Sequence, residues 1–144
     1  MLDIQHLLVI NASPETVFKA ITEQENLEKW LTFETHAIPQ IDSIAEFHFG
    51  EKYHNKMRIV RLEKNELVEW ECIRGHEEWV DTTFIFELEP DQKVTKLRFK
   101  HCGWREKSDM FASCNYHWGF YLHSLKHYCE TGEGHPFTGK LHIE

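Results

Sequence analysis

The chain has 144 residues, and its 24 acidic against 16 basic side chains give a formal net charge of −8 at pH 7. This charge disfavours nucleic acids and anionic membrane surfaces as partners, because both attract clustered lysine and arginine. Hydrophobic residues make up 41% of the chain without any run approaching the roughly 20 residues of a membrane span, and the four cysteines form no Cys-x-x-Cys pair, so we expect a cytoplasmic protein with reduced thiols.

The length suits a single domain over residues 1–144, and the segment HLLVI predicts a short first strand. The start of the chain has no basic region, so no signal peptide is expected. A helix follows, because Ser13 is a favoured N-cap residue and Pro14 suits the first helical position. The segment ENLEKWL predicts a second short helix, with Trp30 on its apolar side.

From about residue 34 to residue 102 the apolar residues alternate with period two, which indicates an antiparallel sheet with one apolar and one charged face. Turns are predicted at residues 52–55 and at the segment EPDQK. One strand is predicted to begin at Trp79. The inward positions that matter below are Phe47, Phe49, Trp70, Thr82, Phe84, Phe99 and His101.

A long C-terminal helix is predicted to start after Ser108 or Asp109 and to end near Thr131, because Gly132, Gly134 and Pro136 follow. Its residues fall on three faces. The face toward the sheet holds Phe111, Cys114, Trp118, Leu122, Leu125 and Cys129; the boundary holds Met110, His117, Tyr121 and Tyr128; the outer face holds Tyr116, Phe120, His123 and His127.

This distribution disperses the histidines and cysteines of the C-terminal helix, so we predict no metal site, no cofactor and no catalytic residue. His123 and His127 have the spacing of a shared metal site, but no third ligand is evident and solvated histidines are favoured. His101 and Cys102 are adjacent on a strand and face opposite sides, which disfavours zinc binding together with Cys114. Cys114 and His117 are one turn apart, yet a buried thiol is usually inert.

Three stretches carry a family resemblance: INASPETVFKAITEQENLEKW, TKLRFKHCGW and NYHWGFYLHSLKHYCETGEGHPF. They resemble the opening strand and helices, the last strand and the terminal helix of the SRPBCC (START/Bet v 1-like) superfamily. The nearest branch is the one named after the C-terminal domain of the heat-shock-protein-90 ATPase activator. The resemblance implies an α+β helix-grip fold, in which a curved antiparallel sheet wraps around the C-terminal helix.

The resemblance also implies a cavity between the sheet and the C-terminal helix. Projected onto that fold, the lining comprises Phe47, Phe49, Trp70, Thr82, Phe84, Phe99, His101, Cys114, His117, Trp118 and Tyr121, with Trp30, Phe33 and Trp104 near the mouth. Pockets of this kind carry few polar groups. The polar residues expected to orient a ligand are Thr82, His101, His117 and Tyr121.

The function expected from this resemblance is the binding of a small hydrophobic ligand, aromatic or lipid-like, in the cavity. One alternative is a cyclase- or hydrolase-type enzyme that uses His101 or His117 as its acid or base. Another is a co-chaperone or protein-interaction role, which rests on the name of the branch, and Tyr116 with Phe120 offers a possible homodimer contact. A further alternative is that the aromatic residues pack into a solid core that leaves no void.

Overall fold

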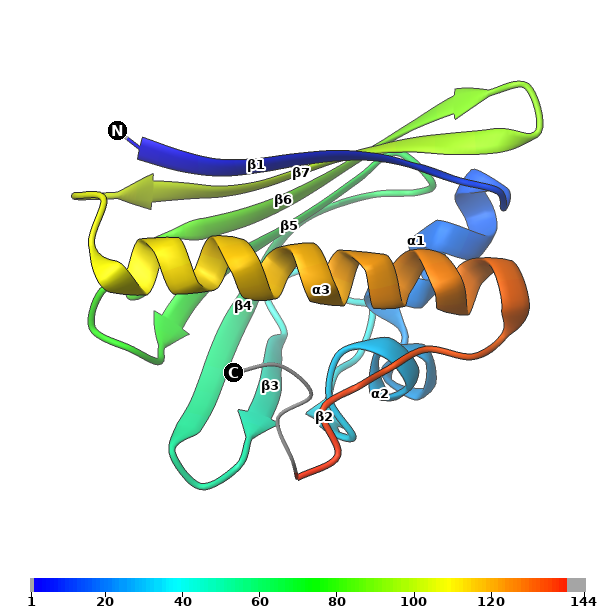
Figure 1. Ribbon diagram of the computed structural model, residues 1–144. Coiled ribbons are helices and arrows are strands. Elements are labelled where there is room, and N and C mark those ends of the chain that lie inside the picture. Colours follow the sequence, from blue (N-terminus) through cyan, green and yellow to red (C-terminus); the bar gives the residue numbers. More distant parts are fainter. Residues whose placement is uncertain (1, 140–144) are drawn as a thin grey trace.

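Seven antiparallel strands form one curved sheet, and the longest helix crosses its concave side (Figure 1). The computed structural model describes residues 2–139. Along the sheet the strands are ordered β1-β7-β6-β5-β4-β3-β2. In chain order the elements are β1 (Leu2–Ile10), α1 (Pro14–Thr22), α2 (Gln24–Trp30), β2 (Glu34–His36), β3 (Ile44–Phe49), β4 (Tyr53–Glu63), β5 (Leu67–Arg74), β6 (Thr83–Asp91), β7 (Val94–Trp104) and α3 (Asp109–Thr131). This arrangement confirms the predicted helix-grip fold.

Both predicted helix starts are confirmed by their caps. Ser13 Oγ accepts a hydrogen bond from the backbone N–H of Thr16 at 3.2 Å, and Pro14 is the first residue of α1. Ser108 Oγ accepts from the backbone N–H of Phe111 at 3.1 Å at the start of α3. These side chains satisfy N–H groups that have no partner inside a helix.

The end of α3 is also as predicted, because Gly132 adopts the left-handed conformation, with a φ of 88°, that favours glycine. Among residues 2–139 no helix is both long and apolar enough to cross a membrane. One prediction about α3 is wrong. Phe120 does not point to solvent but lies half-buried against the hydrophobic core.

Several strand boundaries differ from the sequence prediction, and β1 begins at Leu2 rather than at His6. The turn between β3 and β4 occupies residues 50–52, so β4 starts at Tyr53 rather than after Asn55. β6 starts at Thr83, because Trp79 and the residues after it fold into a turn in which the backbone N–H of Thr82 donates to Trp79 O at 2.9 Å. Asp81 has a φ of 73° in this turn, which ends the alternating pattern.

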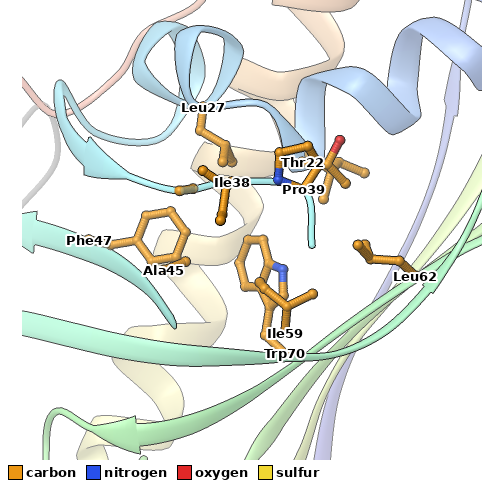
Figure 2. Close-up of a pocket in the computed structure, with 11 residues that line it drawn as sticks. Thr22, Leu27, Ile38, Pro39, Ala45, Phe47, Ile59, Leu62 and Trp70 are labelled. Carbon is orange, nitrogen blue, oxygen red and sulfur yellow. The ribbon is translucent and has the colours of Figure 1, made fainter. Parts of the chain in front are cut away.

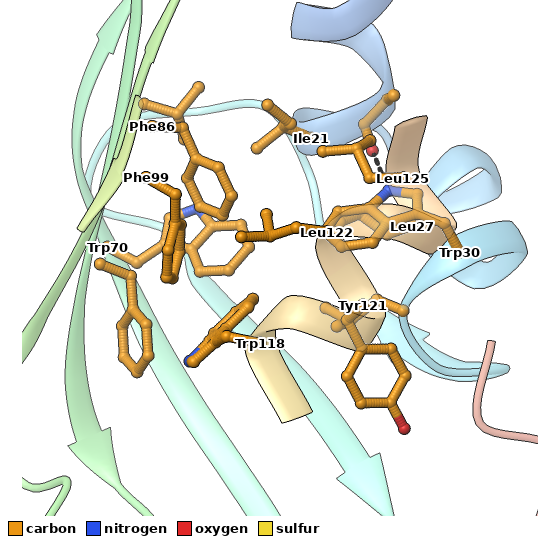
Figure 3. Packing of buried hydrophobic residues seen from close by; sticks show 14 of the residues in the cluster. Ile21, Leu27, Trp30, Trp70, Phe86, Phe99, Trp118, Tyr121, Leu122 and Leu125 are labelled. Atoms are coloured by element: carbon orange, nitrogen blue, oxygen red, sulfur yellow. Dashed lines mark hydrogen bonds between the residues drawn. The ribbon is translucent and has the colours of Figure 1, made fainter. Parts of the chain in front are cut away.

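In the hydrophobic core, α1 and α2 pack against the C-terminal half of α3 (Figure 3). Trp30 is fully buried there, and its indole Nε1–H donates to the backbone carbonyl of Ala20 at 2.7 Å. Ile21, Leu27 and Leu125 surround it in the same cluster. A buried indole that has a hydrogen-bond partner contributes a large apolar area without the cost of an unpaired donor.

The segment after α3 packs back against α2. A Cβ added to Gly134 would lie 2.4 Å from Lys29 O, so only glycine permits this close approach. The hydroxyl of buried Ser124 donates to Trp30 O at 2.9 Å and accepts from the backbone N–H of His135 at 2.7 Å. Buried Phe137 completes this end of the core.

Candidate ligand-binding cavity

A cavity of about 210 Å³ lies between the N-terminal half of α3 and the strands β3 to β6. Its wall carries no charged Asp, Glu, Lys or Arg side chain and is dominated by aromatic and aliphatic residues. The residues that line it are Leu31, Phe47, Phe49, Tyr53, Asn55, Met57, Trp70, His76, Trp79, Phe84, Met110, Ser113, Cys114, His117, Trp118 and Tyr121. An apolar wall with a few polar groups is typical of a small-molecule site.

A second void, on the other side of Trp70, is far smaller. It has a volume of about 10 Å³ beside Ile38, Pro39 and Leu62 (Figure 2). That volume is at or below the roughly 10–15 Å³ that one water molecule requires. Of these two voids, only the larger has room for a ligand.

Eight of the residues predicted from the sequence lie in the cavity wall: Phe47, Phe49, Trp70, Phe84, Cys114, His117, Trp118 and Tyr121. Those from β3, β5 and β6 face inward because side chains alternate along a strand. The others lie on consecutive turns of α3. The structure therefore brings together residues from distant parts of the chain into one wall.

The remaining predicted residues lie outside the lining. Trp30 and Trp104 are fully buried rather than near the mouth, and Trp104 packs edge-on against Phe111. Phe33 is 45% exposed and its ring lies 6.4 Å from that of Phe137. Phe99 is covered by Trp118, whose ring centroid is 4.3 Å away.

Thr82 and His101 form a buried pair behind the cavity wall. Thr82 Oγ1 donates to Trp79 O at 2.6 Å and lies 2.8 Å from His101 Nε2. Because the threonine proton is directed to that carbonyl, His101 Nε2 carries a proton and donates to Thr82 Oγ1. Phe84 stacks on the imidazole at 3.9 Å, and burial lowers the pKa of His101 to about 3. His101 is thus neutral near pH 7 and separated from any ligand by Phe84 and Trp79.

The polar side chains of the cavity wall without a hydrogen-bond partner within residues 2–139 include the amide of Asn55 and the hydroxyl of Tyr121. Asn55 is 3% exposed and Tyr121 is 8% exposed. Burial raises the pKa of Tyr121 to about 12, so its hydroxyl stays protonated. Neither group is among the unpaired polar atoms that are shielded from water, so both are accessible and can form a hydrogen bond with a cavity occupant.

The two histidines of the wall expose nitrogens of opposite character. His117 Nδ1 lies 2.8 Å from the carbonyl of Ser113, which only accepts, so this nitrogen carries the proton and Nε2 is an acceptor when the ring is neutral. His76 Nδ1 accepts from the backbone N–H of Glu78 at 3.1 Å, so its Nε2 is the donor. The wall therefore offers both a donor and an acceptor from imidazoles.

Cys114 is held as an inert thiol in this wall. The indole Nε1–H of Trp79 donates to Cys114 Sγ at 3.1 Å, and burial raises the pKa of the thiol to about 11. A reactive cysteine needs the opposite shift, toward the thiolate. The geometry supports a structural role for Cys114.

Most of the lining residues that sequence reasoning missed come from two segments. Asn55 and Met57 face inward on β4, and extending the alternation of that strand back across the misplaced turn would have identified them. His76 and Trp79 come from the loop between β5 and β6, where no periodic pattern exists to reveal them. Leu31, Tyr53, Met110 and Ser113 complete the lining at its edges.

Comparison with known proteins identifies the fold and the family. Residues 11–130 match the family model described as Activator of Hsp90 ATPase homolog 1-like protein. A search of curated proteins found no match. The solution structure of the Aha1 dimer from Colwellia psychrerythraea is 34% identical with a TM-score of 0.85, and the match covers 93% of this chain and 100% of that one.

Two other solved structures share the fold at lower identity. Protein SSP2350 from Staphylococcus saprophyticus is 18% identical with a TM-score of 0.78, over 93% of this chain and 96% of that one. Protein CV1439 from Chromobacterium violaceum is 21% identical with a TM-score of 0.73, and the match covers 89% of this chain and 96% of that one. These findings confirm the resemblance seen in the sequence, and the chain belongs to the family of Activator of Hsp90 ATPase homolog 1-like proteins.

Proposed function

We propose that this protein binds a small, neutral aromatic molecule in the cavity beneath α3. The observation that carries the proposal is the pair of unpaired polar groups, on Asn55 and Tyr121, in an otherwise apolar and aromatic wall. A flat ring stacks well on the aromatic side chains, and one polar substituent would satisfy the amide or the hydroxyl. The absence of charged side chains from the lining argues against an ionic ligand.

The volume limits the size of this ligand. An apolar cavity of about 150 Å³ accommodates benzene, so a cavity of about 210 Å³ fits one or two fused rings. Drug-sized ligands occupy sites of roughly 300–1,000 Å³. A three-ring flavonoid or a long-chain fatty acid would require the cavity to widen, so the proposal favours compact bicyclic aromatics.

The test is calorimetric titration with indole and 2-naphthol, which combine a bicyclic ring with one hydrogen-bonding group. We expect Tyr121→Phe to weaken binding by about fivefold to tenfold, the effect of one lost hydrogen bond. Asn55→Leu should weaken binding by a similar factor, because leucine keeps the shape of the side chain but removes the amide. Tyr116→Phe is the matched control, since Tyr116 lies on the same helix and is 59% exposed. Equal affinity in wild type and Asn55→Leu would contradict the proposal.

The proposal is for binding rather than turnover. His101 is buried and neutral behind the wall, which removes one of the two histidines considered for catalysis. His117 remains in the wall, but no carboxylate lines the cavity to assist it. The family description suggests a contact with a chaperone ATPase instead, which predicts ATPase stimulation that Asn55→Leu leaves unchanged.

We also propose that the protein forms a homodimer, as the 34% identical relative does. Leu7 and Val9 on the edge strand β1 are 63% and 48% exposed, an unusual density of apolar side chains on an outer face. The homodimer contact predicted from the sequence used the rings of Tyr116 and Phe120. Phe120 packs against the core of its own chain, which makes its ring less available for that contact. Sedimentation analysis of Leu7→Lys and Tyr116→Lys discriminates the two surfaces.

A further inference from the structure

The outer face of the sheet at β2, β3 and β4 gathers histidine and glutamate side chains. On β3, Ala45 and Phe47 are buried toward the core, so Glu46 and His48 between and after them point outward. The antiparallel register places His54 of β4 directly opposite His48. Side chains of directly opposed residues lie on the same face of a sheet. All three side chains therefore meet on one surface.

Their potential ligand atoms are already close together. The carboxylate and imidazole atoms of Glu46, His48 and His54 lie within 4.8 Å of one another, and all three residues are half-buried. Glu46 Oε1 and His54 Nε2 are 3.0 Å apart. In a tetrahedral zinc site with bonds of about 2.0–2.1 Å, neighbouring ligand atoms are roughly 3.3 Å apart. The Glu46–His54 pair nearly has that spacing, and a ligand atom of His48 lies within 4.8 Å of both.

The two imidazoles are stacked face to face, with 3.8 Å between ring centroids. Neither ring donates to the other, and Lys56 Nζ lies 3.9 Å from Glu46 Oε1 on the same surface. A metal ion that coordinates both rings would use this proximity.

We propose that Glu46, His48 and His54 bind a divalent transition-metal ion of the Zn²⁺ type, with water completing the coordination. Two imidazole nitrogens and one carboxylate oxygen are a donor set that zinc uses, with a fourth position left open. Imidazole favours Zn²⁺, Ni²⁺ and Cu²⁺ over Ca²⁺ and Mg²⁺, which prefer oxygen ligands. The sequence pattern is Glu-x-His followed by a histidine across the next turn.

Neighbouring charges on this face act in opposite directions. In the register of β2 with β3, Glu34 lies opposite His48 and His36 lies opposite Glu46. Glu34 adds negative charge beside the site and favours a cation. Lys56, opposite Glu46 on β4, competes with the metal for the carboxylate. Removing the lysine charge should therefore tighten metal binding, whereas removing a ligand should weaken it.

The test is calorimetric titration of the full chain with Zn²⁺ at pH 7.5. We expect one site that His54→Gln and Glu46→Gln each weaken by at least about tenfold, the effect of losing one ligand. Lys56→Gln should tighten the same site by a few fold. The control is His123→Gln, because His123 is an exposed member of the other histidine pair with metal-ligand spacing, on α3. That variant should bind Zn²⁺ as the wild type does.

A second readout locates the metal. Paramagnetic Co²⁺ should broaden amide NMR signals of β3 and β4 and leave α3 unaffected. If His54→Gln lowers the melting temperature without metal, His48→Asn provides an independent loss of ligand. Binding that survives both variants, or that His123→Gln abolishes, would overturn the proposal, as would the absence of any Zn²⁺ affinity above that of His54→Gln.

Discussion

The two halves of α3 cover the same sheet with the same kinds of residue, yet one half is packed solid and the other is hollow. At the C-terminal half, Leu125 meets Trp30 and Ile21 from α2 and α1 (Figure 3). At the N-terminal half no helix fills the space, and a loop with His76 and Trp79 forms part of the wall of a cavity of about 210 Å³. Aromatic content therefore does not decide whether an interior is hollow. What decides it is which helices or loops pack against that part of the sheet.

The largest expected effect is the loss in free energy of unfolding when an apolar side chain is removed from each half of α3. We expect Leu125→Ala to lower the free energy of unfolding by about 3 kcal/mol, because Leu125 is fully buried and its neighbours cannot close the gap. Met110→Ala should cost about 1 kcal/mol, since Met110 is half-buried and already borders a void. Urea denaturation monitored by circular dichroism measures both. Equal losses would mean that the two ends are equally well packed.

A smaller effect comes from His101, which lies behind the cavity wall. Burial lowers its pKa to about 3, whereas an unfolded chain has a histidine pKa of about 6.5. The unfolded state therefore binds the proton more readily, so the stabilisation is complete above pH 6.5 and is lost as the pH falls from there toward 3. Between pH 7.5 and pH 5 the free energy of unfolding should fall by about 2 kcal/mol.

This pH window lies above the range in which Glu46 and Glu130 titrate, because their pKa values are shifted below the ordinary carboxyl value of 4.5. Denaturation at a series of pH values measures the slope, and NMR titration of the imidazole measures the pKa directly. A His101 pKa near 6.5 would show that water from the cavity reaches the ring. The wall formed by Phe84 and Trp79 would then be open rather than closed.

Most of the fold could be predicted from the sequence because its signals are local. Ser13, Pro14 and Ser108 mark helix starts through hydrogen bonds within three residues, and strand alternation identifies which side chains face inward. The errors arose where a turn depends on backbone conformation. Asp81, with a φ of 73°, ends the alternation that predicted a strand from Trp79.

The cavity was harder to predict because its position depends on which inward-facing side chains do not contact one another in the folded structure. Alternation places Phe84 and Phe99 on the same inward face, but only Phe84 borders the void, since Trp118 covers Phe99. His76 reaches the cavity from a loop that no periodicity describes. The outer histidines were missed for a similar reason, because His48 and His54 become neighbours only once the register of the hairpin is known.

The smallest expected effect is a difference in labelling rate between two buried thiols, Cys72 and Cys114, that differ in their access to a reagent. Burial raises the pKa values of Cys72 and Cys114 to about 11 each, so at pH 8.5 both have nearly the same small fraction of thiolate. Cys72 is enclosed in the packed interior, whereas Cys114 borders the cavity. A pulse of iodoacetamide at pH 8.5 should therefore label both slowly but Cys114 faster, as read by peptide mass mapping, and indole in the cavity should slow Cys114 alone. In urea the two should react alike. If Cys72 reacts as fast as Cys114 in the folded protein, labelling proceeds through wider opening of the structure, and the N-terminal half of α3 is as closed as the C-terminal half.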